Sequence, residues 1–203
     1  IGLTPFVVFY FYSAGKVAEL TLQTNKDRLV SLRETKKNQI ENYFKNIASQ
    51  ASTFSKSFMM VDAMDKFSNS FSQVEQQTIA SESENLESKL SGRYRYQQEN
   101  TPGAPDNAVA KWMPKDKASQ ILQNLYISSN PDPIGEKQKL DAANDLSMYS
   151  QIHGQYHPTI RRYLEEFGYY DIFLVDAETG FIVYSVFKEV DYATNLKTGP
   201  YKD

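Results

Sequence analysis

The stretch YYDIFLVDAETGFIVYSVFKEVDYATNL, residues 169–196, decides the fold class, because it reads as β-structure in a chain that otherwise reads as helical. Two apolar segments flank an Asp-Ala-Glu-Thr-Gly turn, in which Gly180 supplies the positive φ that hairpin loops need. A lone two-stranded hairpin is only marginally stable in water. We therefore expect the hairpin to pack on the helices, and its sheet to continue beyond Asp203.

The chain before this hairpin predicts long helices. No Gly or Pro occurs between Gly15 and Gly92. Apolar residues spaced alternately four and three apart form a heptad seam, which comprises Ile40, Phe44, Ile47, Ala51, Phe54, Phe58 and Val61. We expect nearly continuous helix over residues 20–70. The side chains of Phe44, Phe54, Phe58 and Met64 should be buried, either against the chain's own helices or in a dimer partner.

Shorter helices are expected between the seam and the hairpin. Polar helix is predicted over 72–98, a loop over 100–108, and helix over 136–155. The segment HPTIRRYLEEFG, residues 157–168, predicts a further helix with Pro158 in its first turn and Gly168 as its C-cap. The sequence thus predicts an α+β fold, in which a long N-terminal helix and a helical bundle precede the first strands of an antiparallel sheet.

The N-terminal segment IGLTPFVVFYFYSAGK is apolar and carries no charged side chain before Lys16. It is shorter than the roughly 20 apolar residues that span a bilayer. Aromatic residues followed by charges are typical of the interfacial end of a membrane helix. We interpret residues 1–14 as the outer end of a transmembrane helix. The alternative is an apolar segment buried within the fold.

Composition excludes several classes of function. The 203 residues include 22 basic and 25 acidic side chains, and no basic stripe alternates with aromatic residues as a nucleic-acid groove would require. The absence of cysteine excludes disulfides, cysteine-ligated zinc, iron–sulfur clusters and thiol catalysis. We expect no nucleic-acid partner and no cofactor.

Catalytic and metal-binding patterns are weak. His153 and His157 in HGQYH have the spacing of a zinc-binding helix, but Gly154 stands where metalloproteases carry their glutamate, and Pro158 interrupts the helical register. Histidines that line a pocket or a surface are the favoured interpretation. No Ser-His-Asp order and no glycine-rich phosphate loop is present. We therefore expect a protein that is not an enzyme and holds no metal.

Polar aromatic and acidic residues near the hairpin predict a ligand pocket. Tyr and Asp side chains can line a wet pocket that binds an amine or a carbonyl group. The candidate ligand-binding residues are Tyr149, His153, Tyr169, Asp171, Phe173, Tyr184 and Asp191. Strand alternation places Asp171 and Phe173 on one face, so the candidates cannot all point inward. The alternative is that they are ordinary surface tyrosines and strand-end aspartates.

Two long segments resemble a known family. YHPTIRRYLEEFGYYDIFLVDAETGFIVYSVFKEVDYATNLKTGPY, residues 156–201, resembles the extracytoplasmic sensor region of bacterial methyl-accepting chemotaxis receptors and related transmembrane sensors. IENYFKNIASQASTFSKSFMMVDAM, residues 40–64, resembles their long first helix. These proteins belong with the Cache, or extracellular PAS-like, sensors. The family's Arg and Trp pattern for binding amino acids has no counterpart around SGRYRYQQEN, residues 91–100, so the ligand stays open.

The resemblance implies a domain organisation and a function. Residues 15–99 would be membrane-proximal and dimerisation helices, 100–168 the helical part of the sensor, and 169–203 the start of a PAS-like sheet. The implied protein is a homodimeric chemoreceptor of the inner membrane, whose periplasmic domain binds a small molecule such as an amino acid or a carboxylate. The chain would be a sensor segment cut at both ends. The alternatives are a ligand-free helical stalk or dimerisation module, and the sensor of a histidine kinase or a diguanylate cyclase.

Overall fold

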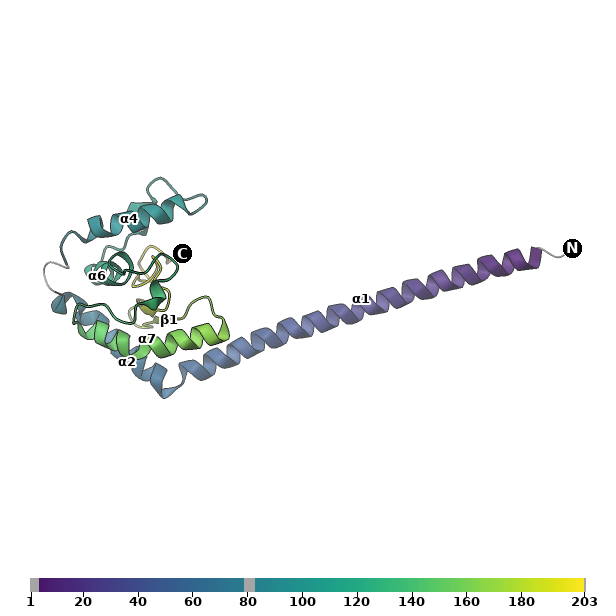
Figure 1. Ribbon diagram of the computed structural model, residues 1–203, viewed down its shortest axis with the longest axis horizontal. Helices are drawn as coiled ribbons and strands as arrows, with labels where there is room; N and C mark the ends of the chain where they lie inside the picture. The colour runs from purple at the N-terminus through teal and green to yellow at the C-terminus, as the bar shows by residue number, and fades with distance from the viewer. Residues whose placement is uncertain (1–3, 79–82, 203) are drawn as a thin grey trace. The chain divides into compact units, whose positions relative to one another are not determined.

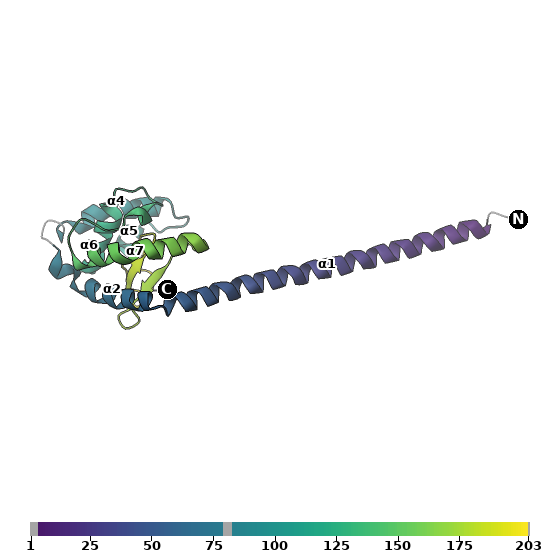
Figure 2. The ribbon, with the colours of Figure 1, turned by 60° about the horizontal axis from the view of Figure 1, so that its bottom comes forward.

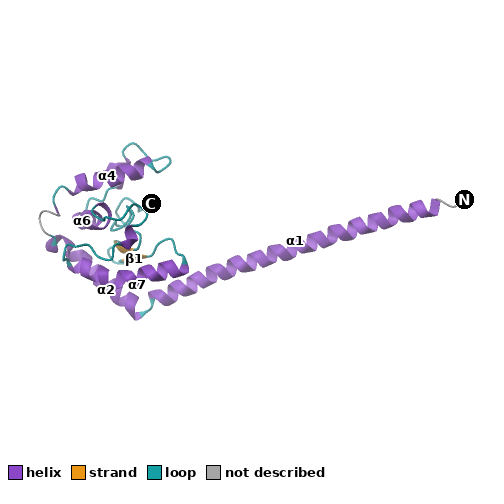
Figure 3. Cartoon of the chain, in the orientation of Figure 1, coloured by secondary structure: helices purple, strands orange, loops and turns teal. Residues whose placement is uncertain are grey.

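The computed structural model describes residues 4–78 and 83–202, and the chain divides into two compact units (Figure 1). The first unit ends at Ser57 and the second begins at Phe58. Most described residues are helical, and one two-stranded antiparallel sheet lies near the end of the chain (Figure 3). The predicted helical character and the predicted hairpin are therefore both confirmed. This division differs from the predicted one, in which the segment boundaries follow residues 14, 99 and 168.

The first unit is one long helix, α1, which runs from Thr4 to Ser55. Its 52 residues correspond to a length of about 78 Å at 1.5 Å per residue. Large apolar side chains from Phe6 to Tyr12 are exposed, so the alternative that this segment is buried within the fold is wrong. In the described parts of the chain, no helix combines the length and the hydropathy that a bilayer crossing requires.

The predicted continuous helix over residues 20–70 is wrong at one place, because α1 ends at Ser55 and α2 begins at Phe58. Serine side chains explain the break without Gly or Pro. The hydroxyl of Ser57 donates to the carbonyl oxygen of Phe54 at 2.7 Å, and that of Ser55 donates to Ser52 at 3.2 Å. Such bonds to nearby carbonyls compete with the bonds that propagate a helix.

The seam side chains are less buried than expected. Phe44 is 63% exposed and Phe58 is 87% exposed, so the expectation that the chain's own helices bury them is wrong. Phe54 and Met64 are partly buried. The other option for these side chains, contact with a second copy of the chain, remains a prediction.

The second unit contains the remaining elements, which are α2 (Phe58–Gln77), α4 (Leu86–Glu99), α5 (Ala108–Trp112), α6 (Lys117–Gln123), a π-helical turn (Asn124–Ser128), a 3-10 turn (Lys137–Lys139), α7 (Met148–Phe167), β1 (Phe173–Val175) and β2 (Ile182–Ser185). Helix α2 packs against α7, α6 and β2. Figures 1 and 2 show α2 and α7 side by side. Helix α4 packs against α5, α6 and the π-helical turn.

Two predicted helices have other boundaries. The predicted helix over 72–98 is split, because α2 ends at Gln77 and α4 begins at Leu86; residues 79–82 of it lie outside the described residues. The predicted helix over 136–155 is confirmed only over 148–155, the first part of α7, because residues 136–147 form a loop with one 3-10 turn. The side chain of Ser147 caps this helix by accepting the N–H of Ser150 at 3.1 Å.

Pro158 lies inside α7 rather than at the start of a helix, so the predicted start at Pro158 is wrong. A proline in a helix interior removes one backbone hydrogen bond and crowds the preceding turn. Burial on both sides of it offsets this cost, because Tyr149 and Ile152 before it and Ile160 and Leu164 after it are all buried. The predicted C-cap is confirmed: Gly168 has φ 67°, and its N–H donates to the carbonyl oxygen of Leu164.

The hairpin pairs Phe173 with Ser185 and Leu174 with Tyr184, and a bulge follows. The predicted turn is confirmed, since Gly180 has φ 86° and its N–H donates to the carbonyl oxygen of Asp176 at 2.7 Å. All four residues of β2 are buried, whereas β1 is more exposed.

The chain itself supplies backbone partners at the outer edge of β2. The N–H of Ile182 donates to the carbonyl oxygen of Thr194 at 2.9 Å, and the N–H of Leu196 donates to that of Gly180 at 2.8 Å. Part of the edge that we expected further strands to cover is therefore paired by the returning segment 194–196. Free edges of a sheet otherwise recruit other strands.

The core of the second unit forms around the ring of Phe67, which is fully buried on α2. Its centroid lies 4.8 Å from that of Tyr184 on β2 and 5.4 Å from that of Tyr149 on α7. Tilted aromatic contacts of this kind add to the free energy gained from burial. Phe67 thus joins a helix pair to the sheet.

We predict that Phe67→Ala lowers the free energy of unfolding by about 3–5 kcal/mol, because it opens a cavity that rigid rings cannot fill. The matched control is Phe167→Ala on α7, where the ring is half-exposed and the expected loss is below about 1 kcal/mol. Urea denaturation of the two variants measures both values. Equal losses in the two variants would contradict the role of Phe67.

Candidate functional site

The structure distributes the seven predicted site residues over three places. Tyr149, His153 and Tyr184 come together in the buried core around Phe67. Asp171 and Asp191 lie beside the hairpin and are partly buried. Two others lie nearer the surface: Tyr169 stacks on Tyr163 at 6.0 Å between ring centroids, and Phe173 is 40% exposed.

Helix α7 places His153 and His157 on one face, where their rings stack at 4.4 Å between centroids. His157 Nε2 carries a proton, because it faces the carbonyl oxygen of Gln138 at 2.6 Å, and a carbonyl can only accept. Its Nδ1 therefore accepts from the hydroxyl of Tyr184 at 2.6 Å. Burial and the nearby charge of Lys188 lower the pKa of His157 to about 3, so the ring is neutral at physiological pH.

His153 is neutral for the same reason, since burial and then Lys188 hold its pKa well below the usual value. Its Nδ1 donates to the carbonyl oxygen of Asp141 at 2.5 Å, and its buried Nε2 has no hydrogen-bond partner among the described residues. Three of the four imidazole nitrogens of the pair are thus engaged by the protein. Within the described ranges, no group of three or more His, Asp or Glu side chains could hold a metal ion.

Sequence reasoning missed Lys188, which is almost fully buried beside the histidines. Its ammonium lies over three tyrosine rings at distances of 4.6–5.8 Å from their centroids, those of Tyr126, Tyr184 and Tyr192. It donates to the carbonyl oxygens of Ser185 and Val186. Burial lowers the pKa of Lys188 to about 7, and the charge of Asp171 opposes that shift. In the sequence, Lys188 reads as an ordinary exposed strand residue.

Asp171 has a structural task. One of its carboxylate oxygens accepts the backbone N–H groups of Ile172 at 2.6 Å, Val186 at 2.9 Å and Phe187 at 3.3 Å. The side chain therefore ties the two ends of the hairpin together. All three bonds end on Oδ1, so Oδ2 keeps its acceptor capacity and the assignment of Asp171 to a ligand site remains a prediction.

Asp191 differs, because its buried Oδ1 has no hydrogen-bond partner among the described residues. Burial raises the pKa of Asp191 to about 6, and the charges of Asp171 and Glu189 add to this shift. Backbone N–H groups of Asp191 and Tyr192 oppose this shift, so only the unpaired oxygen of the carboxylate adds a cost in stability. Groups kept in such costly states are concentrated at functional sites.

Two further side chains have unpaired buried polar atoms, and one of them, that of Tyr201, lies within reach of the charges of both Asp191 and Arg93. The Nη1 atom of Arg93, on α4, and the hydroxyl of Tyr201 have no partner among the residues that the structure describes. Burial raises the pKa of Tyr201, the charge of Asp191 adds to that shift and the charge of Arg93 opposes it, so both charges act on this phenol. We call Arg93, Asp191 and Tyr201 the Arg93 cluster.

The Arg93 cluster lies beside an apolar wall of buried side chains. Leu90, Tyr94 and Val190 are buried together there, and the partly buried hydrophobic side chains packed against them are those of Val109, Trp112, Met113 and Tyr201. The hydroxyl of Tyr94 donates to Gln123 at 2.7 Å, and Gln123 in turn donates to the carbonyl oxygen of Val190 at 2.9 Å. These bonds hold α4 to the segment that carries Asp191.

Opposite charges beside an apolar wall can bind a small molecule that carries both a carboxylate and an amine. A guanidinium binds a carboxylate through parallel N–H bonds, and a carboxylate accepts from an ammonium. Sequence reasoning identified Asp191 but missed Arg93 and Tyr201. A single arginine on a polar helix carries no local signal of burial, and Tyr201 lies outside any predicted element.

Comparisons with protein-family models, curated proteins and solved structures found no match to this chain. Two observations bear on function, namely the geometry of the Arg93 cluster and the predicted resemblance of residues 40–64 and 156–201 to chemoreceptor sensors. The first concerns what the site can bind. The second concerns the kind of protein to which it belongs.

We predict that Asp191→Asn changes how stability depends on pH. The unfolded carboxyl group loses its proton near pH 4 and the native one near pH 6, so the native state binds more protons in this window. Stability contributed by Asp191 is therefore lost as the pH rises from 4 to 6. Relative to the wild type, Asp191→Asn should gain about 2–3 kcal/mol between pH 4 and pH 7.

Urea denaturation at a series of pH values measures this difference. Asp176→Asn is the opposing control, since Asp176 accepts hydrogen bonds in the exposed turn and its pKa is lowered. That variant should lose stability at neutral pH rather than gain it. A flat difference between wild type and Asp191→Asn would show that Asp191 is not an uncompensated buried carboxylate.

Proposed function

We propose that residues 58–202 form the small-molecule-binding module of a bacterial transmembrane sensor, and that its ligand binds at the Arg93 cluster. The observation that carries this proposal is the set of buried polar atoms without partners on two oppositely charged side chains and one phenol. Native structures leave few buried polar groups without a hydrogen-bond partner. A ligand that forms hydrogen bonds to these atoms would remove their cost in stability, and the free energy regained would contribute to its affinity.

The chemistry of the site favours a zwitterion, such as an amino acid. Its carboxylate would lie against Arg93, and its amine would donate to Asp191 and contact Tyr201. The wall around Leu90 and Tyr94 would accept an apolar side chain. A carboxylate without an amine would satisfy Arg93 but leave Asp191 unpaired, so we expect it to bind more weakly.

The resemblance of residues 40–64 and 156–201 to chemotaxis receptors supports the wider proposal. The module would lie in the periplasm, carried by a protein of the inner membrane, and α1 would lead toward the membrane. Ligand binding would shift the population between two packings of the receptor and pass the signal to a cytoplasmic domain. The cytoplasmic output could also be a histidine kinase or a diguanylate cyclase. The role of the module is binding rather than catalysis.

A thermal-shift screen tests the binding proposal. We expect at least one of the common amino acids to raise the unfolding midpoint, because a ligand that binds only the native state stabilises it. Asp191→Asn and Arg93→Gln should each abolish the shift. The matched control is Arg95→Gln on the same helix, where the side chain is exposed and the shift should persist.

Two outcomes would contradict the proposed site. The first is a panel of amino acids and dicarboxylates in which no member raises the midpoint. The second is a ligand whose shift survives in Arg93→Gln, since that ligand would bind elsewhere. Folding of each variant is checked by its cooperative melting without ligand.

A second candidate function is a stalk or dimerisation module without a ligand. The specific observation is the exposure of seam side chains on α1 and at the start of α2, including Ile40, Phe44 and Val61. An unpaired apolar seam of heptad spacing is typical of a helix that pairs with a second helix. A homodimer is also expected of the sensor, so only the ligand screen separates the two functions.

We predict that the chain is a dimer by light scattering, and that the double variant Ile40→Glu, Phe44→Glu is monomeric at the same concentration. Two charges in an apolar seam would oppose close approach of the helices. The control carries the same charges on another face, at Asn42 and Asn46, and should remain a dimer. A wild-type monomer would remove the support for both the seam and the stalk.

A further inference from the structure

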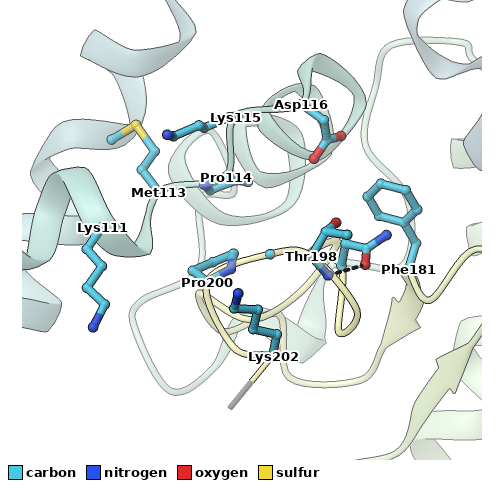
Figure 4. A pocket seen from close by; sticks show the side chains of 11 residues that line it. Lys111, Met113, Pro114, Lys115, Asp116, Phe181, Thr198, Pro200 and Lys202 are labelled. Carbon is cyan, nitrogen blue, oxygen red and sulfur yellow. Dashed lines mark hydrogen bonds between the residues drawn. The ribbon is translucent and has the colours of Figure 1, made fainter.

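A separate pocket lies between the helical part of the second unit and the end of the chain, and Met113 lines it. Its volume is about 440 Å³, within the range of sites that hold one small molecule. Its lining residues are Lys111, residues 113–116, Phe181, Asn195, residues 198–200 and Lys202 (Figure 4). None of the three members of the Arg93 cluster lines it.

The rim of this pocket is positively charged. Lys111, Lys115 and Lys202 line it, and among the described residues none of them forms an ion pair. Figure 4 shows Lys202 across the pocket from Lys115. The one acidic lining residue is Asp116, whose carboxylate caps α6 by accepting the backbone N–H of Ser119 at 2.8 Å. The lining therefore carries a net charge of about +2 at neutral pH.

The walls of the same pocket are apolar. Met113 and Pro114 form one wall, and Phe181 and Pro200 contribute from the sheet and the end of the chain (Figure 4). A pocket of this kind suits a molecule with an apolar body and an anionic group. An inorganic anion would make no contact with the apolar walls.

The loop that carries the far wall is pre-formed. Asn195 Oδ1 accepts the backbone N–H groups of Lys197 at 2.8 Å and Thr198 at 3.0 Å. A Cβ atom at Gly199 would collide with the carbonyl oxygen of Asn195, so this turn needs glycine. The ammonium of Lys197 fastens the loop to the hairpin turn through the carbonyl oxygens of Ala177 and Glu178. A ligand would therefore enter a shaped pocket rather than order a loose one.

We propose that this pocket binds a small organic carboxylate, with its charge among Lys111, Lys115 and Lys202 and its apolar body between Pro114 and Phe181. The occupant is a single small molecule. The enclosed volume is too small for a protein segment, and the charge is confined to the rim. This inference goes beyond the proposed function and does not depend on it.

Isothermal titration with phenylacetate tests the proposal. We expect the triple variant K111Q/K115Q/K202Q to bind at least about tenfold more weakly than the wild type, and the wild-type affinity to fall as salt rises. The matched control is Lys45→Gln on α1, which removes one exposed charge elsewhere and should change affinity by less than about twofold.

Three further measurements decide whether the proposal fails. Phenylacetamide, the neutral analogue, should not bind, and binding equal to that of phenylacetate would overturn the role of the lysines. Inorganic phosphate should not compete, and equal competition would reduce the pocket to a general anion site. Arg93→Gln should leave in place the phenylacetate binding that the triple lysine variant removes. A loss of phenylacetate binding in Arg93→Gln would show that phenylacetate binds at the Arg93 cluster, and it would overturn the inference.

Discussion

The second unit depends on one buried contact, that of the Phe67 ring with aromatic rings from α7 and β2. The hairpin is too short to be stable by itself. It becomes stable because Tyr184 faces α2 and α7 at once, so that the strands lose their exposed apolar face when the helices assemble. The helix pair gains in turn, because its aromatic stripe would otherwise face water. The helices and the sheet therefore stabilise each other.

The same core contains more polar groups than an ordinary hydrophobic core, and most are satisfied by the loop that precedes α7. The imidazole of His157 and the guanidinium of Arg161 both donate to the carbonyl oxygen of Gln138. His153 donates to the carbonyl oxygen of Asp141. These bonds fix a loop that has little regular structure of its own. Unpaired buried atoms remain on His153, Gln138 and Asp145 as well as in the Arg93 cluster, which differs in combining two opposite charges with a phenol.

Sequence reasoning succeeded where a local rule governs the structure. The turn at Asp176–Gly180 and the cap at Gly168 each depend on a residue type that the backbone conformation requires. It failed where contacts between residues far apart in the sequence determine the structure. The interior position of Pro158 depends on burial of both halves of α7, and the unpaired atom of Arg93 depends on segments nearly a hundred residues away along the chain. The break near Ser57 was a local signal, since serine hydroxyls can replace helix bonds, but heptad spacing concealed it.

Lys188 has a chemical consequence that its packing alone does not suggest. A lysine with a pKa near 7 is partly unprotonated at neutral pH, and an unprotonated amine is a nucleophile. The surrounding tyrosine rings keep reagents away from it in the native state. Acylation of Lys188 by an amine-directed reagent would therefore require the core to open, and in the open state the amine regains the ordinary pKa and reactivity of a solvated lysine. The rate at which Lys188 is acylated would therefore depend on how often the core opens. That rate would report the kinetic stability of the contact between the helices and the sheet.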